Sequence, residues 1–303
     1  MIPEFDLRLL QARDAAALTR LREAAEHVGF LTLRGTDLAP EDVRRVLTAY
    51  GAFFRLPPER KAQVDMARTG ANRGWGAPQS EQVDPNANPD FKEVFDCGVE
   101  LAPGDPWAGR GLAVYAPNLW PDAPDGFQTE IETYFAKARA VAMEVLRAIA
   151  VAMGARETWF DPAFERPMAL LRGNYYPARP QWAAEKDFGI APHTDYGCLT
   201  LLATDGAPGL EVLTADGTWT PVAVQPGTFV INFGEMLEMW TNGQVKATLH
   251  RVIGGTQERL SVPLFFNPSY EADVAPPGAS EPIKAGPHLA RRYDETYLHL
   301  KEA

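Results

Sequence analysis

The sequence predicts a mostly β fold in which two sheets form a roll and helices flank it. From Met168 onward, β-branched and aromatic residues occur in short runs that are separated by turn residues. Because no helical pattern lies between these runs, they are typical of a double-sheet roll. A long helical pattern precedes them. The chain has 303 residues, 46% of them hydrophobic, which is enough for one large core or two moderate ones.

The N-terminal part is predicted to form an α/β cap of helices with a strand. Apolar residues recur at helical intervals over residues 12–28, and Gly29 follows as a stop signal. Residues 30–33 form a short β-prone run. Prolines at helix starts predict two further helices, one over residues 39–54 and a short one that begins at Pro57.

Two loops and a long helix separate this cap from the strands. Residues 69–89 and 102–124 are rich in glycine and proline and are predicted loops. Residues 126–153 carry a broad apolar stripe, which predicts a helix that backs a sheet. We expect an N-terminal region over residues 1–125 and a core over residues 126–303, together forming one compact unit.

The core is predicted to contain seven strands and a final helix. The β-prone runs cover residues 168–176, 198–203, 210–213, 219–224, 228–233, 245–253 and 259–266. Residues 287–303 mix Arg, Tyr, Leu and His and are predicted to form a C-terminal surface helix.

Composition argues against several classes of partner. With 29 basic and 40 acidic residues, the net charge is −11, which repels polyanions, so we expect no nucleic acid partner. No run approaches the roughly 20 apolar residues that a membrane span needs, and the first residues lack a signal-peptide pattern. Cys97 and Cys198 are too few for a disulfide framework and are expected to be buried small hydrophobes. These features predict a cytoplasmic protein with no membrane partner.

The motif His193-Thr194-Asp195 predicts a metal site. On a strand, side chains two apart share a face, so His193 and Asp195 can point at one place. His250, from another strand, would add a second imidazole. Two neutral nitrogens and one carboxylate are the ligands expected for non-haem Fe(II) with open coordination positions. Alone, His-x-Asp is a weak signal that also fits a surface histidine and a turn aspartate.

A second motif, Arg259-Leu260-Ser261, predicts a carboxylate site. Arg259 and Ser261 share a strand face, and a planar guanidinium beside a hydroxyl suits paired hydrogen bonds to a carboxylate. The alternative is a surface arginine and an ordinary strand serine. In an apolar strand, however, an inward arginine needs a partner, because an unpaired buried charge is costly.

Together with the run Arg172-Gly173-Asn174-Tyr175-Tyr176-Pro177, these motifs resemble the isopenicillin N synthase-like branch of the Fe(II)/2-oxoglutarate-dependent oxygenases. Their order and spacing match that family, and Gly29-Phe30 and residues 91–95 are similar to its N-terminal region with less specificity. The resemblance implies a double-stranded β-helix, or jelly-roll, core.

The resemblance also implies a function. It is the oxidation, typically the hydroxylation, of a small-molecule substrate with O2, in which 2-oxoglutarate is converted to succinate and CO2. The implied catalytic and metal residues, which hold Fe(II), are His193, Asp195 and His250. The residues implied to bind the co-substrate 2-oxoglutarate are Arg259, Ser261, Asn174 and Tyr176.

Five further residues are weaker candidates for the substrate pocket. Arg172, Phe265 and Asn267 are expected to line it. Arg73 and Trp75 lie in the glycine-rich segment and could close over the pocket as a lid. Trp75 fits a plain packing anchor equally well.

Two alternative functions are open. Isopenicillin N synthase and the plant ethylene-forming oxidase share the iron triad and the Arg-x-Ser pair but do not use 2-oxoglutarate. The Asn-Tyr-Tyr-Pro run favours 2-oxoglutarate. A non-catalytic roll that binds a metabolite would be expected to have a broken triad or to lack the arginine, whereas this sequence keeps the triad, Arg259 and Ser261.

Overall fold

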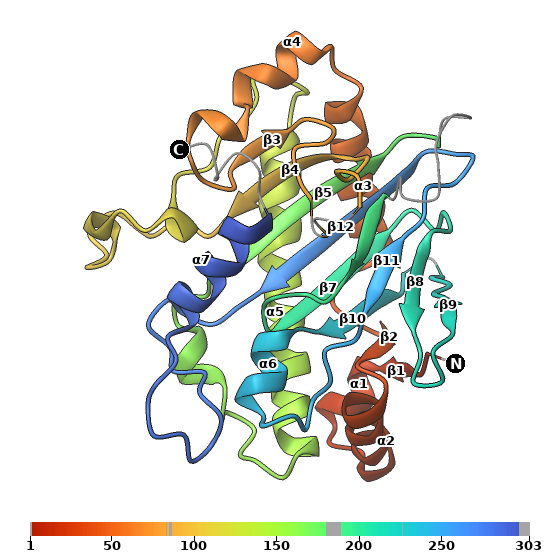
Figure 1. The fold of residues 1–303 in the computed structure, drawn as a ribbon, viewed down its shortest axis with the longest axis vertical. Coiled ribbons are helices and arrows are strands. Elements are labelled where there is room, and N and C mark those ends of the chain that lie inside the picture. The colour runs from red at the N-terminus through yellow and green to blue at the C-terminus, as the bar shows by residue number, and fades with distance from the viewer. Residues whose placement is uncertain (1, 83, 85–86, 180–188, 226, 297–303) are drawn as a thin grey trace.

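Two β-sheets lie face to face, and helices cover the outer face of the larger one (Figure 1). This computed structural model describes residues 2–82, 84, 87–179, 189–225 and 227–296. The predicted mostly β fold with flanking helices is confirmed. Within the described residues, one sheet has eight strands and the other has four.

The large sheet is antiparallel except for the pairing of β1 with β2. Its order across the sheet is β1 (Glu4–Asp6), β2 (Phe30–Arg34), β10 (Phe229–Phe233), β7 (Leu199–Thr204), β12 (Arg259–Phe266), β5 (Leu170–Tyr176), β4 (Glu93–Gly98) and β3 (Gly74–Gly76). The order of the small sheet is β6 (Ile190–His193), β11 (His250–Val252), β8 (Leu210–Leu213) and β9 (Trp219–Pro221).

The helices lie mainly at the N-terminal end and behind the large sheet. They are α1 (Leu7–Gln11), α2 (Ala15–His27), α3 (Pro40–Phe54), α4 (Pro58–Lys61), α5 (Phe127–Ala152), α6 (Glu235–Trp240) and α7 (Ala285–Thr296). The long helix α5 contacts β12 and β7, and α3 contacts β12 and β5. The prediction that residues 126–153 form a helix backing a sheet is therefore confirmed. No helix in the described ranges is long and apolar enough to cross a membrane.

Strand alternation gives the large sheet two different faces. On β12, Val262 and Leu264 belong to the main apolar core that packs against α3 and α5. Ser261 and Phe265 point the other way, into a cavity between the two sheets. Because successive strand residues face opposite sides, one strand can supply both core and site residues.

The N-terminal region contributes strands to both ends of the large sheet. β3 lies within residues 69–89, for which the sequence predicts a loop, and it pairs with β4. Its Gly-Trp-Gly sequence has no β-prone run, so only the pairing partner reveals the strand. β1 and β2 extend the opposite edge. The boundary near residue 125 stays a prediction.

Two predicted strands are shorter than expected. Of residues 245–253, only β11 is a strand. The residues before it instead bind the end of α2: Lys246 N donates to Ala25 O at 2.9 Å, and Thr248 Oγ1 donates to Val28 O at 2.8 Å. In residues 219–224, β9 ends at Pro221, which has no N–H to donate. The predicted C-terminal helix is α7, and residues 297–303 of that prediction lie outside the described residues.

Candidate active site

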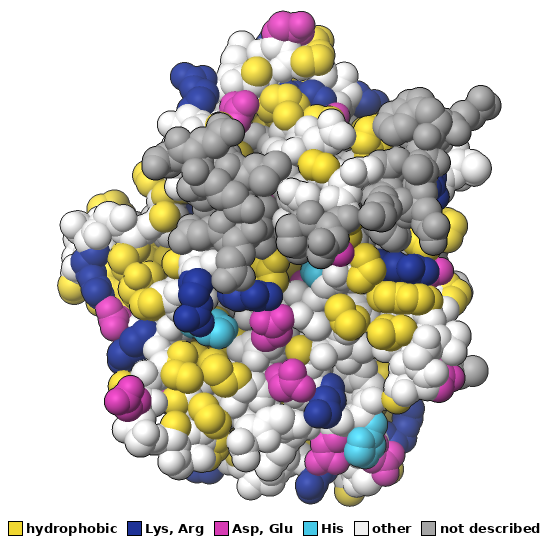
Figure 2. Space-filling view, viewed as in Figure 1, with side chains coloured by type: hydrophobic (Ala, Val, Ile, Leu, Met, Phe, Trp, Pro, Cys, Tyr) yellow, Lys and Arg dark blue, Asp and Glu magenta, His cyan; other side chains and the backbone are white. Residues whose placement is uncertain are grey.

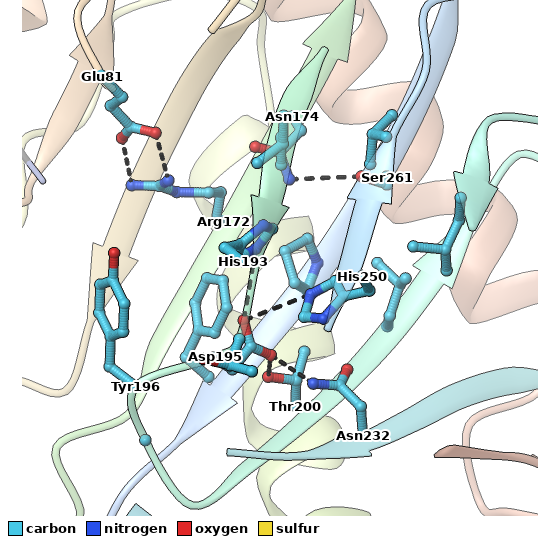
Figure 3. A pocket seen from close by; sticks show the side chains of 18 of the residues that line it. Glu81, Arg172, Asn174, His193, Asp195, Tyr196, Thr200, Asn232, His250 and Ser261 are labelled. Atoms are coloured by element: carbon cyan, nitrogen blue, oxygen red, sulfur yellow. Dashed lines mark hydrogen bonds and ion pairs between the residues drawn. The ribbon is translucent and has the colours of Figure 1, made fainter. Parts of the chain in front are cut away.

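A cavity between the two sheets is lined by most of the predicted site residues (Figure 3). It is lined from the large sheet by β5, β12, β7 and β10, and from the small sheet by β6, β11 and β8. Glu81 and Lys92 of the N-terminal region and Leu289 and Tyr293 of α7 complete its wall. Segments far apart in the sequence therefore meet at one place.

The structure brings His193, Asp195 and His250 together. His193 ends β6 and lies directly opposite His250 of β11. Asp195 lies just beyond the end of β6, so the pair of His193 and Asp195 sits at the edge of a strand, and the Asp195 side chain converges with those of the two histidines. Asp195 Oδ1 is 3.9 Å from His193 Nε2 and 3.7 Å from His250 Nε2. One ligand atom from each residue lies within 4.8 Å of the others.

Backbone carbonyls orient both imidazoles. His193 Nδ1 lies 2.8 Å from Ala191 O, and His250 Nδ1 lies 3.1 Å from Thr248 O. Since a carbonyl can only accept, each Nδ1 carries a proton, and each Nε2 lies on the side of its ring that faces Asp195. Burial, followed by the neighbouring His250, lowers the pKa of His193 well below its ordinary value, so this imidazole is neutral near pH 7.

The second oxygen of Asp195 is held by two neutral donors. Asn232 Nδ2 donates to Asp195 Oδ2 at 2.6 Å, and Thr200 Oγ1 donates to the same oxygen. Burial raises the pKa of Asp195, but the two histidines and these hydrogen bonds outweigh it and lower the pKa. The carboxylate is therefore ionised. Sequence reasoning missed Thr200 and Asn232, whose only signal is a polar residue on a largely apolar strand.

The donor set fits Fe(II). Two imidazole nitrogens and one carboxylate oxygen point toward one another and lie close enough to share one ion (Figure 3). This combination is the one that non-haem iron sites use when further positions stay open for other ligands.

Beside the triad, Arg259 is a buried cation with unused donors. Arg259 is only 4% exposed, and its Nε and Nη1 have no hydrogen-bond partner among the described residues. Opposite Arg259 in the strand pair lies Tyr176, and opposite Ser261 lies Asn174. Asn174 Nδ2 donates to Ser261 Oγ at 3.3 Å. Because unpaired buried donors are costly, this corner is built to receive an acceptor, best an anion.

A buried ion-pair network adjoins the cavity, which three of its members, Glu81, Lys92 and Arg172, help to line. Arg172 donates to Asp96 through Nε at 2.7 Å and Nη2 at 2.6 Å, and to Glu81 through Nη1 at 3.0 Å. Lys92 Nζ contacts Glu81 at 2.7 Å and Asp90 at 2.6 Å. Burial raises the pKa of Glu81, but Arg172 and Lys92 outweigh it and lower the pKa to about 2. Of these five residues, sequence reasoning identified only Arg172 as a site candidate.

The weaker pocket predictions divide into two groups. Arg172, Phe265 and Asn267 do line the cavity. Arg73 and Trp75 are not among the lining residues, and both are buried. Arg73 donates to Val114 O at 2.7 Å, and Trp75 Nε1 donates to Glu93 at 2.8 Å. The lid expectation is therefore wrong for this structure, because these bonds make both residues packing anchors.

Neither cysteine is among the residues that line the cavity. Cys97 and Cys198 are buried and free, as the composition predicts. Cys198 N donates to Asn267 Oδ1 at 2.9 Å, which ties the turn after Asp195 to the end of β12.

Two family models and relatives from other organisms match the sequence of this chain. The model of the 2OG-Fe(II) oxygenase superfamily matches residues 167–268, and that of the non-haem dioxygenase N-terminal region in morphine synthesis matches residues 2–123. A 2-oxoglutarate-Fe(II) type oxidoreductase of Aspergillus fumigatus is 35% identical, over 88% of this chain and 83% of the relative. A homoarginine-6-hydroxylase of Oryza sativa is 33% identical, over 84% of this chain and 79% of the relative.

Solved structures show the same fold. A full-length Neurospora crassa protein in complex with alpha-KG and thymine superposes with a TM-score of 0.84 at 29% identity, covering 97% of this chain and 96% of that one. A putative 2OG-Fe(II) oxygenase family protein of Caulobacter crescentus gives 0.85 at 28% identity, covering 97% and 99%. With its sequence relatives, its fold and an intact His-Asp-His triad, this chain belongs to the 2-oxoglutarate–Fe(II) oxygenase superfamily.

Proposed function

We propose that the cavity between the sheets is the active site of a dioxygenase in which His193, Asp195 and His250 hold Fe(II) and Arg259 anchors 2-oxoglutarate. The observation that carries the second assignment is that Nε and Nη1 of buried Arg259 have no hydrogen-bond partner among the residues that the structure describes. A dicarboxylate can bind the metal through one end and this guanidinium through the other.

Each neighbouring residue has a role in this arrangement. Bound Fe(II) supplies the redox chemistry by which O2 and 2-oxoglutarate oxidise the substrate, with succinate and CO2 as co-products. Arg259 and Ser261 donate to the far carboxylate of 2-oxoglutarate. Asn174 and Tyr176 line the same corner, and the Arg259 guanidinium carbon lies 5.0 Å from the centre of the Tyr176 ring, which limits its movement. The apolar residues between the sheets keep water out.

The prime substrate is a small molecule that fits between the triad and the wall formed by Arg172, Glu81 and Phe265. Relatives are named for homoarginine hydroxylation, and the Neurospora crassa protein was solved with thymine, so these two compounds are the first candidates. On the face shown in Figure 2, acidic and basic side chains of the described residues are interspersed. This mixture, with the net charge of −11, supports a small-molecule partner over a nucleic acid.

The function is tested by succinate formation. The purified chain is incubated with Fe(II), 2-oxoglutarate and O2, alone and with homoarginine or thymine. We expect succinate that requires both Fe(II) and 2-oxoglutarate, increases with a true substrate and disappears with a chelator or in His250→Ala. If O2 is consumed at the same rate without 2-oxoglutarate and no succinate forms, the alternative resembling isopenicillin N synthase is correct.

A further inference from the structure

We propose that Thr200 and Asn232 are positioning residues that restrict Asp195 to metal binding through Oδ1 alone. The proposal rests on the triad of the proposed function and adds two residues that are not ligands themselves. The iron site keeps its open positions because the second oxygen of the Asp195 carboxylate is already hydrogen-bonded.

The two donors form a matched pair across neighbouring strands. Thr200 of β7 and Asn232 of β10 lie directly opposite each other in the antiparallel register. They are 5% and 3% exposed, so water does not compete for their bonds. Both side chains donate to Asp195 Oδ2, while Oδ1 faces the histidines (Figure 3).

The backbone of the Asp195 turn is fixed by other contacts. Glu235 N donates to Asp195 O at 2.8 Å, and Gly234 N donates to Cys198 O at 3.0 Å. A Cβ on Gly234 would lie 2.6 Å from Asp195 O and 2.3 Å from Gly197 O, so glycine allows this close approach. Since these bonds hold the main chain, the side-chain rotation of Asp195 is the freedom left for Thr200 and Asn232 to control.

That rotation matters for the number of open positions. A carboxylate can bind a metal through one oxygen or through both. Binding through both would use a position that 2-oxoglutarate or O2 needs at a three-ligand site. Two hydrogen bonds to Oδ2 oppose this second mode, and they also orient Oδ1 before the metal arrives. Loss of such outer partners typically weakens metal binding about 10–100-fold.

The test compares Thr200→Val and Asn232→Leu with Thr200→Ser, which keeps the hydroxyl. Thr32→Val is the matched control, because Thr32 is a buried threonine on β2 that faces Val230 rather than Asp195. For each protein, anaerobic Fe(II) titration gives the dissociation constant. The Co(II) absorption spectrum reports the coordination number, and circular dichroism reports folding.

We expect Thr200→Val and Asn232→Leu to bind Fe(II) about 10–100-fold more weakly and to give altered Co(II) spectra. Thr200→Ser and Thr32→Val should match the wild type. Folded Thr200→Val with wild-type affinity and an unchanged Co(II) spectrum would overturn the proposal, even if Asn232→Leu fails to fold. If the wild type binds no Fe(II), the proposed function itself fails. If His250→Ala loses the metal while Thr200→Val keeps it unchanged, only this inference fails.

Discussion

Each side chain of the triad is oriented by a bond on the side away from its partners. The imidazoles use backbone carbonyls and the carboxylate uses Asn232 and Thr200. The ligand atoms therefore converge without a bond between them. Such orientation lowers the entropy that metal binding must remove, because the rotamers are already fixed.

Removing one ligand should abolish iron binding. His193→Ala, Asp195→Ala and His250→Ala each leave two ligands, which are too few to hold Fe(II) at working concentration. Folding should survive, because the main core is apolar and lies on the other side of the large sheet. Metal analysis and circular dichroism of the purified variants measure both effects. A variant that retained full iron stoichiometry and turnover would show that the triad is wrongly assigned.

The β5 strand joins the site to the helical layer. Arg172 and Asn174 face the cavity, while Gly173 faces α3, where an added Cβ would lie 2.2 Å from Tyr50 Cδ1. Tyr50 is fully buried and packs against Phe127 and Phe95. A side chain at position 173 would therefore displace either this aromatic cluster or β5 itself.

We accordingly expect Gly173→Ala to lower the free energy of unfolding by about 1–3 kcal/mol, the usual cost of overpacking. It should also weaken 2-oxoglutarate binding, since β5 carries Asn174. Urea unfolding and 2-oxoglutarate titration measure the two effects. Gly109→Ala is the control, because nothing lies within 4 Å of a Cβ there. Equal stability of the two variants would argue against close packing of β5 on α3.

How far the sequence predicts these elements depends on whether the signal is local. α3 and α5 are predicted nearly to the residue, because each has an apolar stripe and a proline or glycine at one end. β3 is missed, because Gly-Trp-Gly becomes a strand only through β4. Motif spacing predicts the triad, which the structure brings together, and it predicts the role of Arg259, which stays a prediction. Thr200, Asn232 and Glu81 are not, because their roles come from contacts between distant segments.

The cavity is a property of the whole chain. Glu81 and Lys92 come from the N-terminal region, Arg172 from the core and Tyr293 from the C-terminal helix, and all line the same space. The ion-pair network crosses from the N-terminal region to β5, and Asp90 Oδ1 also accepts a weak hydrogen bond from Ala191 N of β6 at 3.5 Å. The N-terminal cap is thus tied to the strand that carries His193.

Breaking this network should destabilise the protein. Lys92→Met leaves Glu81 and Asp90 without their shared cation, and removing one partner of a buried pair typically costs about 3–5 kcal/mol. Lys246→Met is a suitable control, because Lys246 is exposed and lies 3.7 Å from Glu238; such a pair contributes at most about 1 kcal/mol. Urea unfolding of both variants provides the comparison. A similar small loss in each would mean that the network does not hold the cap to the core.

Whether Arg259 anchors 2-oxoglutarate beside the iron is measured by titrating the anaerobic Fe(II) complex with 2-oxoglutarate and following the metal-to-ligand charge-transfer band. Arg259→Lys keeps the charge but loses the paired donors, and a charge-assisted hydrogen bond contributes roughly 1.5–3 kcal/mol. Affinity should fall by about one to two orders of magnitude. Fe(II) binding should be unchanged, and Ser261→Ala should show a smaller loss.

Arg147→Lys is the control for the same exchange, because Arg147 lies on α5 and pairs with Asp161, away from the cavity. Its titration should match the wild type. An unchanged 2-oxoglutarate titration for Arg259→Lys, together with weaker binding of the prime substrate, would show that Arg259 binds a carboxylate of the substrate and not 2-oxoglutarate.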